Sequence, residues 1–166
     1  EGLEPVRRML NAAYIFEELM PSELNFTALT VGEPFEVSDI HVTAHPTSHL
    51  HQLKEHFVKK YPAKYEAFCF LLESNETRVA HSADIGALAD LNPLLTQPVD
   101  LLVCELAHVE PKELFTYLAD KEIGQVAFMH LSRPYREKLD ELKTQANSIL
   151  GNLPHTFLDD GDLIEV

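Results

Sequence analysis

The sequence contains no apolar run close to the ~20 residues that a membrane-spanning helix needs. Its first five residues, EGLEP, include no Met, no basic cluster and no start of the apolar core of a secretory signal. We therefore expect no membrane segment and a cytoplasmic location. A start without Met, directly before a helix-like segment, also suggests that the sequence begins in mid-protein.

Basic residues are few. The chain has 13 Lys and Arg against 27 Asp and Glu, a formal charge of −14 with His neutral. A field of this sign repels phosphate backbones and argues against nucleic acid as a partner. A small anionic substrate stays compatible if a metal holds it, because a dication dominates the field around it.

Cysteine is scarce too. Cys69 and Cys104 each lie inside an apolar run, which is typical of buried free thiols in a reducing compartment. With 166 residues and 45% apolar content, residues 1–166 are expected to form a single domain, or part of one.

The first half of the chain is rich in short strands. The hydrophobic pattern predicts a helix at 4–20 and a loop with a short helix at 45–64. Strands are predicted at 25–29, 35–37, 40–44, 67–72 and 78–81, the last two as a hairpin.

Helices and strands alternate in the second half. Helices are predicted at 87–95, 111–120 and 134–149, and strands at 100–104, 125–129, 156–158 and 163–166. The two patterns together predict an α/β (α+β) fold, a mixed β-sheet with helices on one face.

Three metal-ligating side chains lie at the ends of predicted strands. His49, Asp84 and His130 could converge where those strands end, as binding sites do in layered α/β folds. Imidazole with carboxylate suits Zn²⁺, and also Fe or Mn. Residue types alone leave a second interpretation open, in which these are surface histidines and a turn aspartate.

Four segments resemble metal motifs of the metallo-β-lactamase superfamily, in that family's order. Residues 42–49 (VTAHPTSH) are similar to its strand followed by Pro-x-x-His. Residues 78–86 (RVAHSADIG) resemble its strand ending in Ser-Gly-Asp-Thr, and 100–108 (DLLVCELAH) its acidic strand end. Residues 126–132 (VAFMHLS) resemble Thr-His-x-Ser, and 160–165 match the final turn and strand.

The resemblance covers roughly residues 25–166 and implies half of an αββα sandwich. In such a protein His49 would ligate one divalent metal, His130 a second, and Asp84 would bridge them. Two metals, with Zn favoured over Fe or Mn, would activate a hydroxide to attack an ester or phosphodiester-type bond of a small anionic substrate.

The resemblance also assigns supporting roles. Glu105 and His108 would transfer protons or support the ligands, although helix capping or a solvated loop explains them equally well. Residues 130–135 (HLSRPY) are similar to the His-x-Ser-x-Arg-Tyr run of ribonuclease Z-like members, in which Ser and Arg hold phosphate. Ser132 and Arg133 are therefore candidate substrate-binding residues, with Arg133 one position earlier than in that pattern.

The family's leading motif, His-x-His-x-Asp-His, is missing from the sequence. The nearest run, residues 49–54, has Leu53 and Lys54 in place of Asp-His. We therefore interpret the chain as the C-terminal portion of the domain, completed by an upstream segment or by another chain in a homodimer. Ala83 replaces the usual Gly of the bridging motif, which would strain a turn that requires positive φ.

These observations support two functions. The first is a metallo-hydrolase, active as the intact protein, with little or no turnover by this chain alone. The second is a non-catalytic binding or scaffold domain that kept the fold and lost the metals. A generic α/β domain with incidental histidines is the third interpretation.

Overall fold

The computed structural model describes residues 3–166. Backbone contacts divide the chain into two compact units, with the boundary between Thr30 and Val31. The single domain expected from the length stays a prediction. The described residues contain no helix that is both long and apolar enough to cross a membrane.

The first unit contains α1 (Leu3–Ala12) and the 3-10 helix η1 (Glu17–Leu19). The helix predicted at 4–20 ends early because Tyr14 adopts φ 59°, and the Ile15 N–H then donates to the Leu10 carbonyl at 2.9 Å. This hydrogen bond closes the helix C-terminus in a Schellman turn. The segment predicted as a strand at 25–29 forms no strand.

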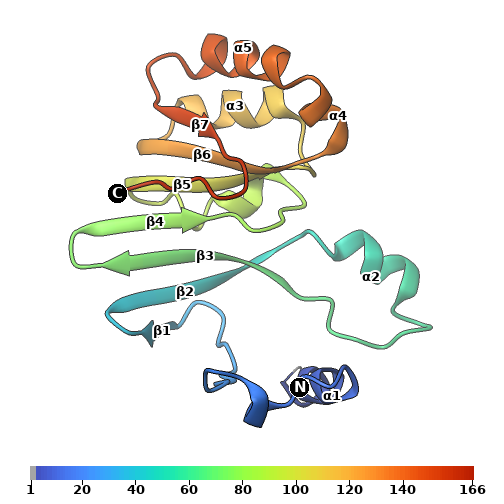
Figure 1. Cartoon of the computed structure of the whole chain (residues 1–166). Helices are drawn as coiled ribbons and strands as arrows, with labels where there is room; N and C mark the ends of the chain where they lie inside the picture. Colours follow the sequence, from blue (N-terminus) through green and yellow to red (C-terminus); the bar gives the residue numbers. More distant parts are fainter. Residues whose placement is uncertain (1–2) are drawn as a thin grey trace. The chain divides into compact units, whose positions relative to one another are not determined.

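The second unit is built on a seven-stranded mixed sheet whose strands lie in chain order (Figure 1). The first four strands are antiparallel, and the last four, β4 to β7, are parallel to one another. This confirms the predicted mixed α/β fold. The strands are β1 (Pro34–Val37), β2 (Ile40–Thr47), β3 (Ala67–Ser74), β4 (Thr77–His81), β5 (Val99–Leu106), β6 (Ile123–Leu131) and β7 (His155–Phe157).

The helices of this unit differ from the predictions at two places. The helix predicted at 87–95 is only a 3-10 turn, because Pro93 has no N–H with which to continue it. The helix predicted at 134–149 is broken at Lys138, which has φ −122°. The elements are α2 (His51–Phe57), η2 (Leu88–Leu91), α3 (Pro111–Ala119), α4 (Arg133–Glu137) and α5 (Leu139–Leu150), and 163–166 forms no strand.

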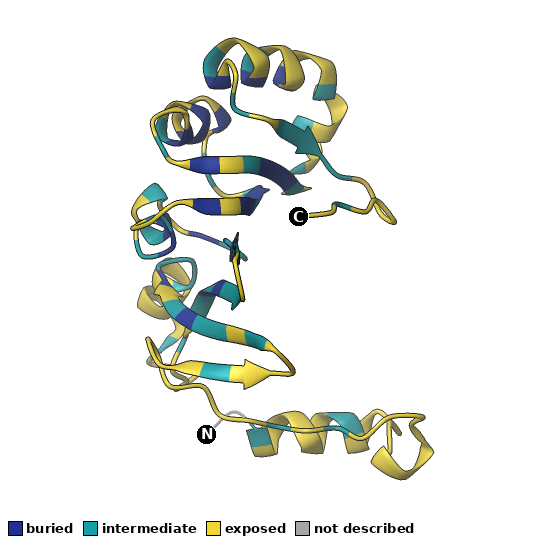
Figure 2. Cartoon of the chain, turned by 90° about the vertical axis from the view of Figure 1, so that its left-hand side faces the viewer, coloured by how far each residue is buried: buried dark blue, intermediate teal, exposed yellow. Residues whose placement is uncertain are grey.

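Helices α3 and α5 cover one face of the sheet, because successive right-handed crossovers between parallel strands return to the same side. Leu142, Ala146 and Leu150 recur every fourth residue and form the buried stripe of α5. They share one core cluster with α3, β5 and β6, where the buried residues gather (Figure 2). Both free thiols, Cys69 and Cys104, belong to this cluster, as expected from the sequence.

The opposite face of the sheet is also apolar but less buried. Strand registry places residues of this face side by side from β2 to β5. Most of them are only half-buried, in contrast to the helix-covered core. These half-buried residues are Val42, Phe70, Leu72, Val79 and Val103.

Strand direction determines where the polar residues meet. Strands β2 and β4 are both antiparallel to β3, so they run the same way, and β5 and β6 are parallel to β4. All four strands therefore finish at the same end of the sheet, which we call the C-terminal end. The other end, where β4, β5 and β6 begin, is the opposite end.

Candidate metal centre

A pocket of about 300 Å³ opens at the C-terminal end of the sheet. Its lining comes from segments far apart in the chain: His49 after β2, Asp84 after β4, Glu105 near the end of β5 and His130 in β6. The structure therefore brings together the three side chains that the sequence indicated as metal ligands.

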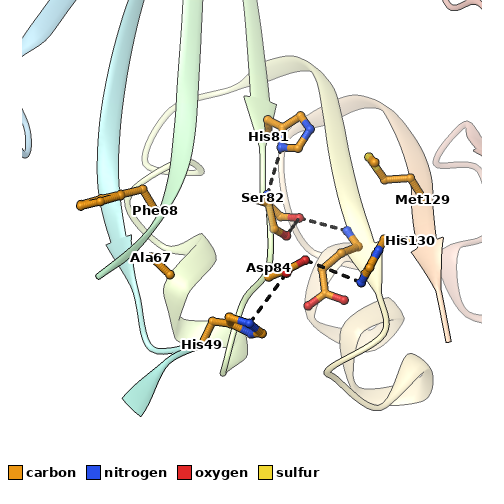
Figure 3. Close-up of a pocket in the computed structure, with 10 residues that line it drawn as sticks. His49, Ala67, Phe68, His81, Ser82, Asp84, Met129 and His130 are labelled. Carbon is orange, nitrogen blue, oxygen red and sulfur yellow. Dashed lines mark hydrogen bonds and ion pairs between the residues drawn. The ribbon is translucent and has the colours of Figure 1, made fainter. Parts of the chain in front are cut away.

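Asp84 lies between two histidines (Figure 3). Its Oδ2 is 3.7 Å from His49 Nε2, and its Oδ1 is 3.8 Å from His130 Nε2. These distances are too long for hydrogen bonds. They are near the separation of ~3.4 Å expected for two atoms that each lie ~2.1 Å from one tetrahedral ion. Each carboxylate oxygen thus has its own imidazole partner.

His108 adds a third imidazole to the cluster. His49, Asp84 and His108 each offer one ligating atom, and these three atoms lie within 4.8 Å of one another. The His108 ring is 4.5 Å from the His49 ring and 5.7 Å from the His130 ring, measured between centroids. The resemblance implied a supporting role for His108, and the structure places it beside the candidate ligands.

Glu105 holds His108 in place. Its side chain is 2% exposed, and its Oε1 lies 3.0 Å from Nδ1 of His108. The same carboxylate accepts the backbone N–H groups of Ile85, Ala107 and His108. A buried carboxylate with this many donors is well satisfied. It fixes the imidazole so that Nε2 is the ring nitrogen left for a metal or a proton.

Comparison with known proteins shows which family the chain belongs to. Residues 3–134 match the family described as the β-lactamase superfamily domain. The chain belongs to the β-lactamase superfamily. No curated protein sequence matches the chain.

Solved structures with the metallo-β-lactamase fold are similar to this chain. The metallo-β-lactamase-fold protein YhfI from Bacillus subtilis has a TM-score of 0.61 at 15% identity. The match covers 82% of this chain and 54% of that one. A proposed metal-dependent hydrolase from Parabacteroides distasonis ATCC 8503 has a TM-score of 0.55 at 12% identity. The match covers 80% of this chain and 57% of that one. Zn²⁺-bound PqqB from Methylobacterium extorquens has a TM-score of 0.55 at 14% identity. The match covers 98% of this chain and 60% of that one.

These likenesses concern the fold, since the identities are low. The chain spans between 54% and 60% of the length of these three structures. The metallo-β-lactamase fold that the sequence resembles is confirmed.

The donor set fits a divalent cation. Three imidazoles and a carboxylate are ligands that Zn²⁺, Fe²⁺ and Mn²⁺ accept. No Lys or Arg is among the residues that line the pocket. A bound cation would therefore compensate the charges of Asp84 and Glu105 without competing with a basic side chain.

Two buried polar residues at this site were not found from the sequence. The Thr47 hydroxyl donates to the Asp84 carbonyl at 2.9 Å. The Ser82 hydroxyl accepts from the Glu105 N–H at 3.0 Å and donates to the Ala83 carbonyl at 2.8 Å. Their position, two places before the candidate ligands His49 and Asp84, was the available signal.

His81 is another pocket residue that the sequence analysis left unassigned. The Ala83 N–H donates to its Nδ1 at 2.9 Å, and burial lowers the pKa of His81. The imidazole is therefore neutral near pH 7, with its proton on Nε2. It supports the turn that carries Asp84.

The backbone is strained at two site residues. Ala83 has φ 45° and His130 has φ 48°, conformations that residues other than Gly rarely adopt. The strain anticipated for Ala83 is therefore present. Strain of this kind concentrates at functional sites, where the surrounding structure enforces it.

The candidate substrate-binding residues lie outside the pocket lining. Ser132 immediately precedes α4, and its side chain makes no capping hydrogen bond. The Arg133 side chain is 89% exposed and pairs with Glu137 at 2.9 Å between Nε and Oε1. The structure does not bring Arg133 to the metal ligands.

Proposed function

We propose that the protein is a metallo-hydrolase that holds two divalent metals, zinc in preference to iron or manganese. In this proposal His49 ligates one metal, His130 the other, and Asp84 bridges them. The observation that carries the proposal is the facing of each Asp84 oxygen toward a different imidazole, at 3.7 and 3.8 Å. When bound, the metals supply an activated water and stabilise charge on the substrate oxygens.

The Glu105–His108 pair provides the proton transfer. Glu105 holds Nδ1 of His108 and leaves Nε2 to act on the substrate. A histidine held in this way can donate a proton to the leaving oxygen as the bond to it breaks. The position of His108 beside His49 and Asp84 supports this role.

The substrate is a small anion with an ester or phosphodiester-type bond. A pocket of about 300 Å³ is the size of a small-ligand site. The charge of −14 opposes a large polyanion such as tRNA, although ribonuclease Z-like members have a run similar to residues 130–135. Ser132 and Arg133 would hold a substrate phosphate only if Arg133 exchanged Glu137 for it.

We also propose that this chain is the C-terminal portion of the sandwich. The missing His-x-His-x-Asp-His motif and the half-buried apolar face support this, because a second sheet would cover that face and bring the remaining ligands. An upstream segment or a second copy of the chain would provide it. Turnover by this chain alone is expected to be low. The free thiols Cys69 and Cys104 suit the reducing cytoplasm.

Elemental analysis tests the proposal. The protein is purified without added metal, then again after incubation with Zn²⁺, Mn²⁺ or Fe²⁺, with hydrolysis of a chromogenic phosphodiester followed in parallel. We expect metal in a fixed ratio to the protein in the wild type and loss of that metal in Asp84→Asn.

A non-catalytic scaffold domain is the second candidate. The absent leading motif and the strained Ala83 favour it. It predicts that the intact protein holds no metal in any of these preparations, whereas the hydrolase predicts bound metal in that protein.

A further inference from the structure

One oxygen of Asp90 accepts four hydrogen bonds. Its Oδ2 receives the Ser48 N–H at 2.9 Å and the Ser48 hydroxyl at 2.8 Å. The same atom receives the N–H groups of Gly86 at 2.9 Å and Ala87 at 3.2 Å. Asp90 lies in η2, outside the pocket lining.

The donors belong to the two loops that carry the candidate metal ligands His49 and Asp84. Ser48 directly precedes His49, and Gly86 lies two residues after Asp84. The loops also touch through their backbones, since a Cβ placed on Gly86 would lie 2.6 Å from the Ser48 carbonyl carbon. Only glycine permits this approach, so the loops form one packed unit with Asp90 as its shared acceptor.

A carboxylate suits this position. Burial alone would raise the pKa of Asp90, but the hydrogen bonds from Ser48, Gly86 and Ala87 hold the pKa below its ordinary value. The group therefore stays ionised at neutral pH. Hydrogen bonds to a charged acceptor are roughly twice as strong as neutral ones, and the loops are held correspondingly firmly.

We propose that Asp90 is a positioning residue that fixes the distance between His49 and Asp84 for metal binding. The inference rests on the proposed function, because it assigns a purpose to that distance. Removing the carboxylate would free the Ser48 and Gly86 loops to separate, and His49 Nε2 would leave its place 3.7 Å from Asp84 Oδ2.

Metal titration of the full chain tests the role. Zn²⁺ affinity is measured by competition with a chromophoric chelator, and Co²⁺ is added separately for its visible absorption spectrum. We expect Asp90→Ala to weaken Zn²⁺ binding about 10- to 100-fold, as for other residues that orient metal ligands, and to change the Co²⁺ spectrum. Asp90→Asn keeps one acceptor oxygen and should recover part of both.

Asp100→Ala is the matched control. Asp100 also accepts a backbone N–H, from Arg78 at 2.7 Å, but at the opposite end of the sheet. Its loss should lower thermal stability without changing Zn²⁺ affinity or the Co²⁺ spectrum. Circular dichroism of each apo variant reports whether it folds, and Asp90→Asn serves if Asp90→Ala does not.

The outcomes separate the two proposals. In one outcome the wild type binds metal and a folded Asp90 variant keeps the same Zn²⁺ affinity and Co²⁺ spectrum. That result would overturn the positioning role and leave the proposed function standing. Absence of metal binding by the wild type would overturn the proposed function and the role that rests on it. A weakened variant beside an unchanged Asp100→Ala supports both.

Discussion

The two ends of the sheet treat their carboxylates differently. At the opposite end, Arg78 pairs with Glu73 at 2.9 Å, and its backbone N–H donates to Asp100. At the C-terminal end, Asp84 and Glu105 meet imidazoles and backbone N–H groups, and no Lys or Arg lines the pocket.

This difference indicates what the C-terminal end lacks. Charge that is removed from water must be compensated. Arg78 supplies a permanent cation at one end, whereas neither Lys nor Arg is among the residues that line the pocket at the other. A divalent metal would supply the missing charge and would be the largest local charge in the pocket. Substitutions that act at one end and not at the other test this interpretation.

Asp84→Asn should have the largest effect. The amide keeps the shape of the carboxylate but removes the charge shared between His49 and His130. We expect metal affinity to fall by more than about 100-fold, beyond the loss seen for supporting partners, and hydrolysis by the intact protein to fall to background. Isothermal titration with Zn²⁺ measures the first, and a phosphodiesterase assay the second.

Asp100→Asn provides the comparison at the opposite end and should bind metal like the wild type. Equal metal affinity in the Asp84 and Asp100 variants would remove the distinction between the two ends.

His108→Ala should separate proton transfer from metal binding. If Nε2 of His108 donates the proton, hydrolysis by the intact protein falls about 10²- to 10⁴-fold while the metal content stays that of the wild type. Parallel kinetics and elemental analysis measure both. Loss of metal together with activity would instead make His108 a ligand, in agreement with its place near His49 and Asp84.

Much of this site could be predicted from the sequence, because strand direction converts chain order into position. Once β2, β4 and β6 run the same way, the ends that carry His49, Asp84 and His130 lie at one end of the sheet. The boundaries were less predictable. The end of α1 depends on positive φ at Tyr14, and the short η2 on a single proline, neither of which hydrophobic periodicity shows.

The role of Asp90 was not predictable for a different reason. Its partner Ser48 lies 42 residues away, and only the packed loops show that one oxygen serves both. The hydrogen bond between Glu105 and His108 was likewise not predicted, although the two residues lie only three positions apart. Side-chain hydrogen bonds across a fold have no periodic signature in the sequence.

Gly86→Ala should destabilise the protein by about 1–3 kcal/mol, the usual cost of overpacking. Its new methyl group would meet the Ser48 backbone at 2.6 Å, and the displaced loops should also weaken metal binding. Denaturant unfolding and Zn²⁺ titration measure these effects.

Gly124→Ala is the counterpart at the opposite end, where a Cβ would lie 2.6 Å from the Asp100 carbonyl oxygen. It should cost similar stability and leave the metal affinity intact. A fall in affinity as large as that of Gly86→Ala would mean that general destabilisation, rather than loop position, controls binding.

Ala83→Gly should have the smallest effect, a gain of up to about 1 kcal/mol in the free energy of unfolding. Glycine adopts φ 45° without the steric cost that a side chain incurs. Ala87→Gly, at φ −156°, should instead lose about 0.5–1 kcal/mol through added freedom of the unfolded chain. Thermal unfolding of both variants checks the opposite signs, and a loss in both would contradict the strain assigned to Ala83.

Anomalous X-ray scattering from crystals of the zinc-incubated protein tests the metal centre most directly. Data collected on both sides of the zinc absorption edge locate the ion itself. We expect a zinc peak about 2.0–2.2 Å from a carboxylate oxygen of Asp84 and from a ring nitrogen of His49 or His130. A pocket without such a peak at saturating zinc, or a peak only at unrelated surface residues, would contradict it.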